Sequence, residues 1–386
     1  MKKIKSFMLA VMALALTAPV LTACSDDDES KNNIVSEYQL NDEMVAAQKA
    51  KSKKDEAVLL VAFGSTWNNA FKAFDATKAA YEKAFPNADV YVCFSSDICI
   101  NRASVGENED ENGNIVKRDY YEPRYLLHAI GAAKYSKIYV QSLQVIPGEE
   151  FANVVACVKK FMNNGYIASA HLDDAYLAEL QENEAIFLGM PLLNDPETDV
   201  PEVAKQLNAA YKDEAAKGVV AFMGHGNPDT YDTFKANIRY TQLEEALQAI
   251  NSNYFVGTVD MPRNYKQDVL ARMQAAGKNS GEIYLHALMS IAGDHAHNDM
   301  AGGMNGVDED EYWDASEPES EDNSWFMFFK NNTYSPKVTL GSNKEPLGLL
   351  EIPGVLNVWI EHTKNAEFLE DAYHSMYPEG DEEDAE

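Results

Sequence analysis

One apolar run, Ala57-Val-Leu-Leu-Val-Ala-Phe63, indicates the fold class, and it ends at a turn, Gly64-Ser-Thr66. A strand that is apolar at nearly every position is typical of a parallel sheet, because helices cover both of its faces. The next segment, 68–85, has apolar residues at helical spacing, and 88–94 is again an apolar strand. Strand, helix and strand in this order predict right-handed βαβ units. We therefore expect an α/β fold with parallel sheets flanked by helices.

The second half of the chain repeats the first. Three pairs of similar segments carry the repeat: 58–66 with 218–226, 91–97 with 254–260, and 137–150 with 282–295. Chance likeness is the alternative, since β-rich segments resemble one another. The repeat predicts two duplicated Rossmann-like domains with a cleft between them.

The proline-containing stretch 191–201 separates the two predicted domains, at 57–198 and 199–386. We expect a last strand region at 347–358 and a final amphipathic helix at 360–377, which is free to pack back on the first domain.

The first 24 residues have the features of a lipoprotein signal peptide. A basic segment, 1–5, precedes an apolar segment, 7–20, and then Leu21-Thr-Ala-Cys24, which resembles a bacterial lipobox. In that motif the cysteine becomes the lipidated N-terminus. We therefore expect an exported protein with a lipid anchor on Cys24, in the periplasm, at the outer membrane or on the cell surface. Residues 25–56 are polar and charged, and predict a flexible tether with one short helix near 41–51.

The net charge of the chain limits the classes of partner that it can bind. The 386 residues include 32 Lys and Arg against 62 Asp and Glu, a formal net charge of −30. Binding to nucleic acid requires clustered Lys and Arg, so the charge argues against a nucleic-acid partner. An acidic surface favours solubility and raises the local concentration of cations. The sequence leaves open whether the protein forms a homo-oligomer.

Three apolar runs in the second half each lead to a side chain that can bind a metal. These side chains are His225, Asp260 and His295. In open α/β sheets, ligands bind at the carboxyl ends of the strands. We therefore expect the three side chains to converge on one divalent metal at the mouth of the cleft. The equivalent positions of the first half are Ser65, Asp97 and Glu150, so only one wall of the cleft carries imidazoles.

Several motifs, in order along the chain, resemble the anaerobic cobalt chelatases, which are sirohydrochlorin cobaltochelatases and class II chelatases related to protoporphyrin ferrochelatase. The motifs are Ala62-Phe-Gly-Ser-Thr66, Val145-Ile-Pro-Gly-Glu-Glu-Phe151, Met223-Gly-His-Gly226, Val256-Gly-Thr-Val259 and Ala292-Gly-Asp-His-Ala-His-Asn-Asp-Met-Ala-Gly302. The resemblance covers residues 57–375. It implies two Rossmann-like domains, a tetrapyrrole in the cleft, insertion of Co²⁺ into sirohydrochlorin, and no nucleotide requirement.

The same resemblance implies roles for individual residues. His225 and His295 look like the metal-binding and catalytic pair, with His225 as the main base. Asp260 stands where the family usually has Glu, so its carboxylate arm is one methylene shorter. These ligands suit Co²⁺, with Ni²⁺ or Fe²⁺ as alternatives. His297 could also face the metal.

The facing wall of the cleft carries three further candidates. We expect Ser65, Glu149 and Glu150 to bind the substrate. Alternatively, the two glutamates only begin a helix, where carboxylates interact favourably with the dipole.

The export signal supports a rival interpretation. Cobalamin synthesis is cytoplasmic, whereas an anchored protein outside the cytoplasm could bind haem or another tetrapyrrole for scavenging, or remove its metal. A protein that only buffers cobalt or nickel is a third interpretation. A Soret absorbance band and separate assays of insertion and removal distinguish the three.

Overall fold

The computed structural model describes residues 31–106, 114–306, 309–320, 322–342 and 344–369. Both faces of the first strand, β1 (Glu56–Ala62), are covered by apolar side chains. Val58, Leu60 and Ala62 belong to one buried cluster, and the residues between them, Leu59 and Val61, to another. This double burial explains why the strand is apolar at successive positions.

The first lobe is built on a five-stranded sheet with the order β2-β1-β3-β4-β9. The other strands are β2 (Ala88–Phe94), β3 (Lys137–Ser142), β4 (Ile186–Gly189) and β9 (Glu367–Phe368). Only β9 runs antiparallel to its neighbour among these described strands. The helices are α3 (Asn68–Ala84), α4 (Asp97–Val105), α5 (Pro123–Ala132), α6 (Glu149–Met162), η1 (Ala168–Ala170) and α7 (Asp174–Glu182).

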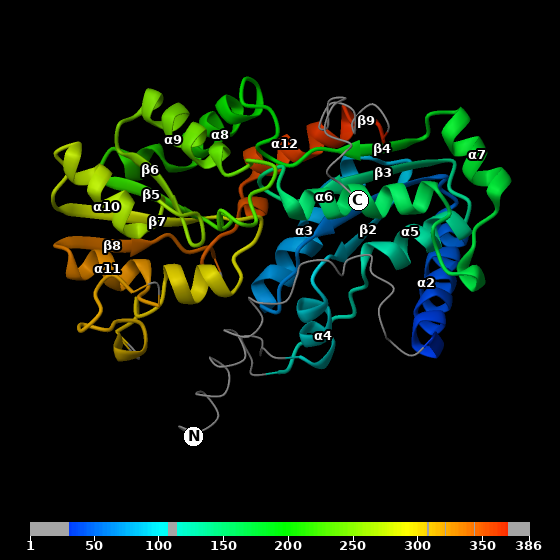
Figure 1. Ribbon diagram of the computed structural model, residues 1–386, viewed down its shortest axis with the longest axis horizontal. Coiled ribbons are helices and arrows are strands. Elements are labelled where there is room, and N and C mark those ends of the chain that lie inside the picture. The colour runs from blue at the N-terminus through cyan, green and yellow to red at the C-terminus, as the bar shows by residue number, and fades with distance from the viewer. Residues whose placement is uncertain (1–30, 107–113, 307–308, 321, 343, 370–386) are drawn as a thin grey trace.

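The second lobe has a parallel sheet with the order β6-β5-β7-β8, which matches the β2-β1-β3-β4 order of the first lobe. Its strands are β5 (Val219–Gly224), β6 (Tyr254–Thr258), β7 (Gly281–Leu288) and β8 (Tyr334–Val338). Its helices are α8 (Asp199–Ala215), α9 (Ile238–Ile250), α10 (Lys266–Ala275), the π-helix η2 (His295–Met300), η3 (Glu309–Glu311) and α11 (Trp325–Asn331). The predicted α/β class, with parallel sheets flanked by helices, is confirmed (Figure 1).

The last described helix differs from the sequence prediction. Instead of a strand at 347–358, the chain forms a short turn, η4 (Leu349–Glu351), and then α12 (Pro353–Lys364). Pro353 occupies the first helical turn, where its fixed φ favours a helix start and its missing N–H costs nothing. The residues from 370 onward in the predicted helix 360–377 lie outside the described part of the chain.

Helix α12 joins the two lobes (Figure 1). The Thr363 hydroxyl contacts Gln141 Oε1 of β3 at 2.7 Å and the Tyr81 hydroxyl of α3 at 3.2 Å. Trp359 is fully buried in an apolar cluster that includes residues of both lobes. The lobes therefore share one continuous core.

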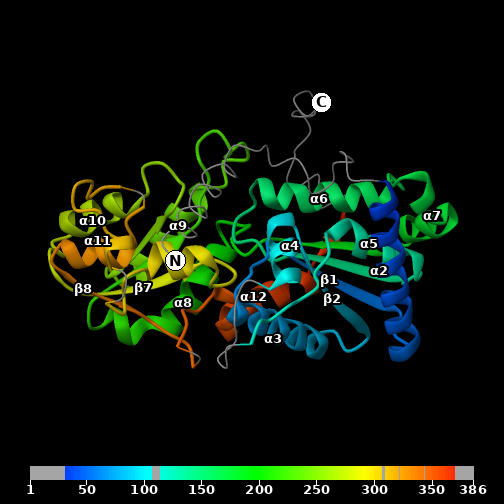
Figure 2. The same cartoon turned by 90° about the horizontal axis from the view of Figure 1, so that it is seen from below.

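Residues 31–52 form a single helix, α2 (Lys31–Ser52), so the predicted flexible tether is wrong for this segment. Figure 2 shows α2 at the outer end of the first lobe, away from the second lobe. The Tyr38 ring is buried with its centroid 4.9 Å from Tyr125 and 4.7 Å from His128. Asp42 Oδ1 accepts a hydrogen bond from His128 Nδ1 at 2.9 Å. Few apolar residues of α2 pack against the first lobe, which explains why the polar and charged composition of this segment predicted a flexible tether.

Tyr38→Ala is expected to lower the free energy of unfolding by about 3–5 kcal/mol, because it leaves a cavity between α2 and α5. Thermal unfolding followed by circular dichroism measures the effect. Leu40→Ala, on the exposed side of the same helix, is the matched control. Equal effects of the two substitutions would contradict a packed α2.

Within the described residues, no helix has both the length and the apolar character needed to span a bilayer.

Candidate functional site

Three side chains of the second lobe follow the carboxyl ends of three neighbouring strands, β5, β6 and β7. His225 follows β5, Asp260 lies two residues after β6, and His295 begins η2 after β7. Because β5 lies between β6 and β7, their carboxyl ends bring the three segments to one edge of the sheet. The distances between the three side chains therefore test the prediction that they lie close together.

The two imidazoles and the carboxylate are neighbours. The ring centroids of His225 and His295 are 4.9 Å apart, with the rings nearly perpendicular at 82°. Asp260 Oδ2 lies 3.8 Å from His225 Nδ1. The side chains of His225 and His295 keep 50% and 41% of their surfaces exposed, so a ligand can reach both rings.

Both imidazoles use Nδ1 for a hydrogen bond inside the protein. His225 Nδ1 lies 2.7 Å from the Gly226 carbonyl oxygen, and His295 Nδ1 lies 2.5 Å from Asp299 Oδ2. These acceptors favour the tautomer that carries hydrogen on Nδ1. Over the described ranges, neither Nε2 has a hydrogen-bond partner. Two lone pairs are thus left for a ligand, in the arrangement by which metal-binding histidines are usually oriented.

A close turn brings the segments of His225 and Asp260 together. Gly226 has φ +76°, and a Cβ at this position would lie 2.8 Å from the Met261 backbone nitrogen, so a side chain does not fit. The turn lets the His225 carbonyl accept a hydrogen bond from the Asp260 N–H at 2.8 Å.

The protein moves the pKa values of the two imidazoles in opposite directions. Burial among surrounding protein atoms lowers the pKa of His225, and repulsion by His295 lowers it further against the attraction of Asp260. Burial also acts to lower the pKa of His295, but the hydrogen bond and charge of Asp299, with Asp260 and Asp294, outweigh it and raise the pKa. Near neutral pH, His225 is therefore the more available proton acceptor.

The three predicted ligands do not form a preassembled metal centre. Among the residues that the structure describes, no group of three His, Cys, Asp or Glu side chains is arranged to hold a metal ion. The short arm of Asp260 faces the Nδ1 side of His225, which already contacts Gly226.

The predicted substrate-binding residues lie on the first lobe in different settings. Ser65 is buried, and its hydroxyl accepts from the Trp67 N–H at 3.2 Å and lies near Gly293 of the second lobe. Glu149 Oε1 accepts from the backbone N–H and hydroxyl of Thr233, at 2.6 and 2.8 Å. Ser65 and Glu149 thus make contacts between the lobes.

Glu150 is a half-buried carboxyl at the start of α6. Its pKa is raised to about 7, mainly because burial disfavours the charged carboxylate; the interaction with Gln144 lowers the pKa and the charge of Glu149 raises it. A carboxyl with this pKa can exchange a proton near neutral pH.

Three side chains that interact within or beside η2 were not among the predicted site residues: Trp67, Asp294 and Asp299. The four-residue spacing of His295 and Asp299 is a signal that was available, because such residues share one face of a helix. His297, predicted as a candidate ligand, is not free to bind metal. Its Nδ1 lies 2.8 Å from the Gly293 carbonyl oxygen and its Nε2 lies 3.0 Å from Glu345.

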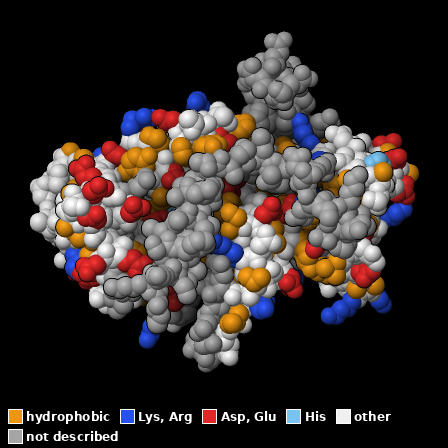
Figure 3. Space-filling view, turned by 60° about the horizontal axis from the view of Figure 1, so that its bottom comes forward, with side chains coloured by type: hydrophobic (Ala, Val, Ile, Leu, Met, Phe, Trp, Pro, Cys, Tyr) orange, Lys and Arg blue, Asp and Glu red, His pale blue; other side chains and the backbone are white. Residues whose placement is uncertain are grey.

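Large apolar side chains are exposed on segments that follow strands of both lobes. They are Phe63 after β1, Ile98 in α4, and Tyr231 and Phe234 after β5. Figure 3 shows acidic side chains spread over the second lobe, on the left, and apolar patches nearer the middle. Exposed aromatic and aliphatic groups on carboxyl-end loops suit a flat apolar ligand.

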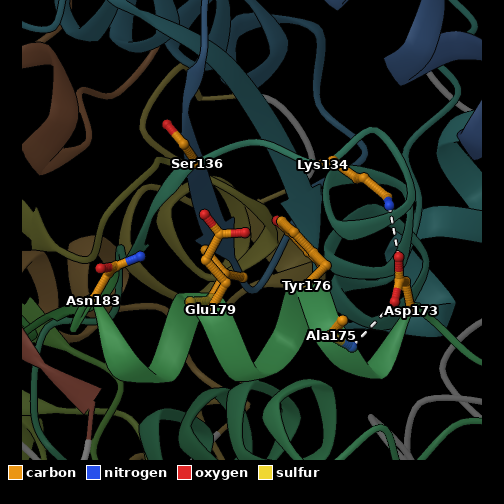
Figure 4. A pocket seen from close by; sticks show the side chains of 8 residues that line it. Lys134, Ser136, Asp173, Ala175, Tyr176, Glu179 and Asn183 are labelled. Atoms are coloured by element: carbon orange, nitrogen blue, oxygen red, sulfur yellow. Dashed lines mark hydrogen bonds and ion pairs between the residues drawn. The ribbon is translucent and has the colours of Figure 1, made fainter.

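A separate surface pocket of about 300 Å³ lies on the first lobe (Figure 4). Its lining includes Lys134, Ser136, Asp173, Tyr176, Glu179 and Asn183. Lys134 forms an ion pair with Asp173 at 2.7 Å. Because Ser136 and Asn183 precede β3 and β4, the pocket lies at the amino ends of the strands, opposite the imidazoles.

The family model described as "Cobalt chelatase (CbiK)" matches residues 56–367. Sirohydrochlorin cobaltochelatase CbiKC of Nitratidesulfovibrio vulgaris is 27% identical over 251 residues, covering 64% of this chain and 76% of that protein. Sirohydrochlorin cobaltochelatase of Salmonella typhimurium is 24% identical over 251 residues, covering 64% and 80%. SirB from Bacillus subtilis with Fe³⁺ shares 12% identity at a TM-score of 0.47, covering 82% and 98%.

Proposed function

The chain belongs to the cobalt chelatase (CbiK) family, and on this premise we propose that it inserts Co²⁺ into sirohydrochlorin without a nucleotide. The observation that carries the proposal is the pair of imidazoles at the carboxyl ends of β5 and β7. Their rings are 4.9 Å apart, and each Nδ1 is engaged while Nε2 is left for a ligand. Two similar proteins, from Nitratidesulfovibrio vulgaris and Salmonella typhimurium, are named sirohydrochlorin cobaltochelatases.

Metal insertion needs a group that delivers the ion and groups that take two protons from the pyrrole nitrogens. His225 suits both tasks, because its lowered pKa keeps it neutral near pH 7. His295, oriented by Asp299, is the second ligand, and Asp260 adds a negative charge beside them. Holding Co²⁺ against the macrocycle supplies proximity. Glu150, with a pKa of about 7, can accept a released proton near neutral pH.

The macrocycle is proposed to lie between the lobes, against the exposed apolar side chains after β1, in α4 and after β5. Two contacts join the lobes: Ser65 lies near Gly293, and Glu149 accepts from Thr233. Glu149 and Ser65 thereby set the separation of the walls, while Glu150 faces the substrate.

The proposal is tested with purified protein, sirohydrochlorin and Co²⁺, following the absorbance change of the macrocycle. Insertion without added nucleotide is expected, and Ni²⁺, Fe²⁺ and protoporphyrin are compared under the same conditions. Incubation with cobalt-loaded sirohydrochlorin measures removal. A stable tetrapyrrole complex with neither insertion nor removal would contradict a chelatase and favour a binding protein.

Asp299→Asn is expected to shift the pH dependence of cobalt insertion to lower pH. His295 binds metal only when deprotonated, so kcat/KM for Co²⁺ rises with pH through its raised pKa. Asn keeps an oxygen acceptor for Nδ1 but removes the charge that raises this pKa. A profile of kcat/KM against pH checks the shift, with Asp310→Asn in the exposed acidic segment as the control. An unmoved rising limb would assign it to another group.

The protein is further proposed to be exported and anchored by a lipid on Cys24. The support is sequence order alone: a basic segment, an apolar segment and Leu21-Thr-Ala-Cys24. Metabolic labelling with a radioactive fatty acid is expected to mark the wild type and not Cys24→Ala. Label retained by Cys24→Ala, or protein found only in the cytoplasm, would exclude this anchor.

A further inference from the structure

The first lobe holds the segment that carries His295. Trp67 lies between β1 and α3, and its ring stacks on His297 with centroids 3.6 Å apart and planes at 7°. Its Nε1–H donates to Asp294 Oδ1 at 2.5 Å. Asn69 Nδ2 donates to the Ala292 carbonyl oxygen at 3.4 Å. These contacts join residues more than 200 positions apart in sequence.

The contacts of Trp67 flank His295 on both sides. Asp294 directly precedes it and His297 follows two residues later, so one indole constrains the backbone before and after the imidazole. The His297 ring is itself fixed, because its two nitrogens lie 2.8 and 3.0 Å from Gly293 and Glu345. Because the Trp67 ring stacks on the fixed His297 ring, the position of η2 depends on the position of the first lobe.

We propose that Trp67 is a positioning residue that couples the arrangement of the two lobes to metal binding at His295. The proposal rests on the proposed function, because it takes His295 to be a metal ligand. Trp67 itself has no metal-binding atom, so it acts through Asp294 and His297. Cobalt affinity at the second lobe then depends on a side chain of the first lobe.

Trp67→Ala removes both contacts, whereas Trp67→Phe keeps a ring for stacking and loses the bond to Asp294. Supporting groups behind metal ligands typically contribute 10–100-fold to metal affinity or activity. Trp67→Ala is therefore expected to raise the Kd for Co²⁺ and the KM for Co²⁺ by about 10–100-fold, with kcat at saturating Co²⁺ nearly retained. Trp67→Phe is expected to give a smaller increase.

The matched control is Trp359→Phe. Trp359 is fully buried in α12, and its Nε1 has no hydrogen-bond partner in the described chain, so the exchange removes no comparable bond. Titration of the tetrapyrrole-free protein with Co²⁺ in a calorimeter measures Kd, and circular dichroism measures folding. A loss of folded protein lowers kcat without moving the KM for Co²⁺, which separates damage to the fold from positioning.

His295→Ala distinguishes failure of this proposal from failure of the proposed site. If His295→Ala weakens Co²⁺ binding while Trp67→Ala and Trp67→Phe match Trp359→Phe, the positioning role is excluded and the site stands. If His295→Ala leaves both Co²⁺ binding and insertion unchanged, the site assignment fails, and the role of Trp67 fails with it. Graded weakening from Trp67→Phe to Trp67→Ala supports the proposal.

Discussion

His225→Ala and His295→Ala are each expected to lower kcat/KM for cobalt insertion by about 10²–10⁴-fold, the usual contribution of a positioned acid or base. The two rings lie 4.9 Å apart, and each leaves Nε2 without a partner among the described residues. Removing either imidazole leaves one nitrogen ligand for Co²⁺. The His225 change also removes the imidazole whose lowered pKa suits proton acceptance.

The double variant is expected to lose little beyond the more damaging single change, because residues that act as a unit are not additive. His171→Ala is the matched control: it removes an exposed imidazole of the first lobe whose Nε2 contacts the Tyr166 carbonyl oxygen. Initial rates over a range of Co²⁺ concentrations give kcat/KM. Insertion at wild-type rates in both single variants would rule out this pair as the site.

Glu150→Gln is expected to stabilise the protein above pH 7 and to have little effect at pH 4. The folded pKa of Glu150 is about 7 against an ordinary value of 4.5, because burial disfavours the charged carboxylate. Below pH 4.5 the carboxyl is protonated in both states and folding carries no penalty. As pH rises to 7 the penalty grows, and above pH 7 it reaches about 3 kcal/mol, at 1.36 kcal/mol per unit of pKa.

Glutamine removes that penalty because it carries no charge at any of these pH values. Thermal midpoints at pH 4, 6 and 8 measure the difference between variant and wild type, which should widen with pH. Glu245→Gln, on the exposed side of α9, is the control for loss of one negative charge. A gain that is the same at all three pH values would show that Glu150 does not titrate in this range. If Glu150 accepts a substrate proton, the stabilised variant also inserts cobalt more slowly.

The strands were predictable because parallel strands bury both faces. The runs 57–63, 88–94 and 283–289 coincide with β1, β2 and β7 to within one or two residues. The motifs that carry the family resemblance follow these strands. The match of the family model to residues 56–367 confirms the resemblance. Helices α2 and α12 were misjudged because tertiary contacts decide them: Tyr38 on α5, and Thr363 on β3.

The nearness of His225, Asp260 and His295 followed from strand order, because neighbouring parallel strands end at one edge of a sheet. Their orientation did not follow. The His225 contact depends on the backbone geometry of the Gly226 turn. The His295 contact depends on the π-helical winding of η2, although the four-residue spacing of His295 and Asp299 was a signal for it. The role of Trp67 could not be predicted from the sequence, because Trp67 contacts residues more than 200 positions away and no sequence spacing relates them.

Because α12 packs against both lobes, the position at which the chain can be cut into two folded halves is restricted. A fragment ending at residue 198 would contain the strands of the first sheet except β9, but not the helix that seals β3 and β4 with Trp359 and Thr363. Such a fragment would present a bare apolar sheet face and is expected to aggregate. Because α12 belongs to the second half of the chain and packs on the first, co-expression with residues 199–386 is expected to recover soluble material.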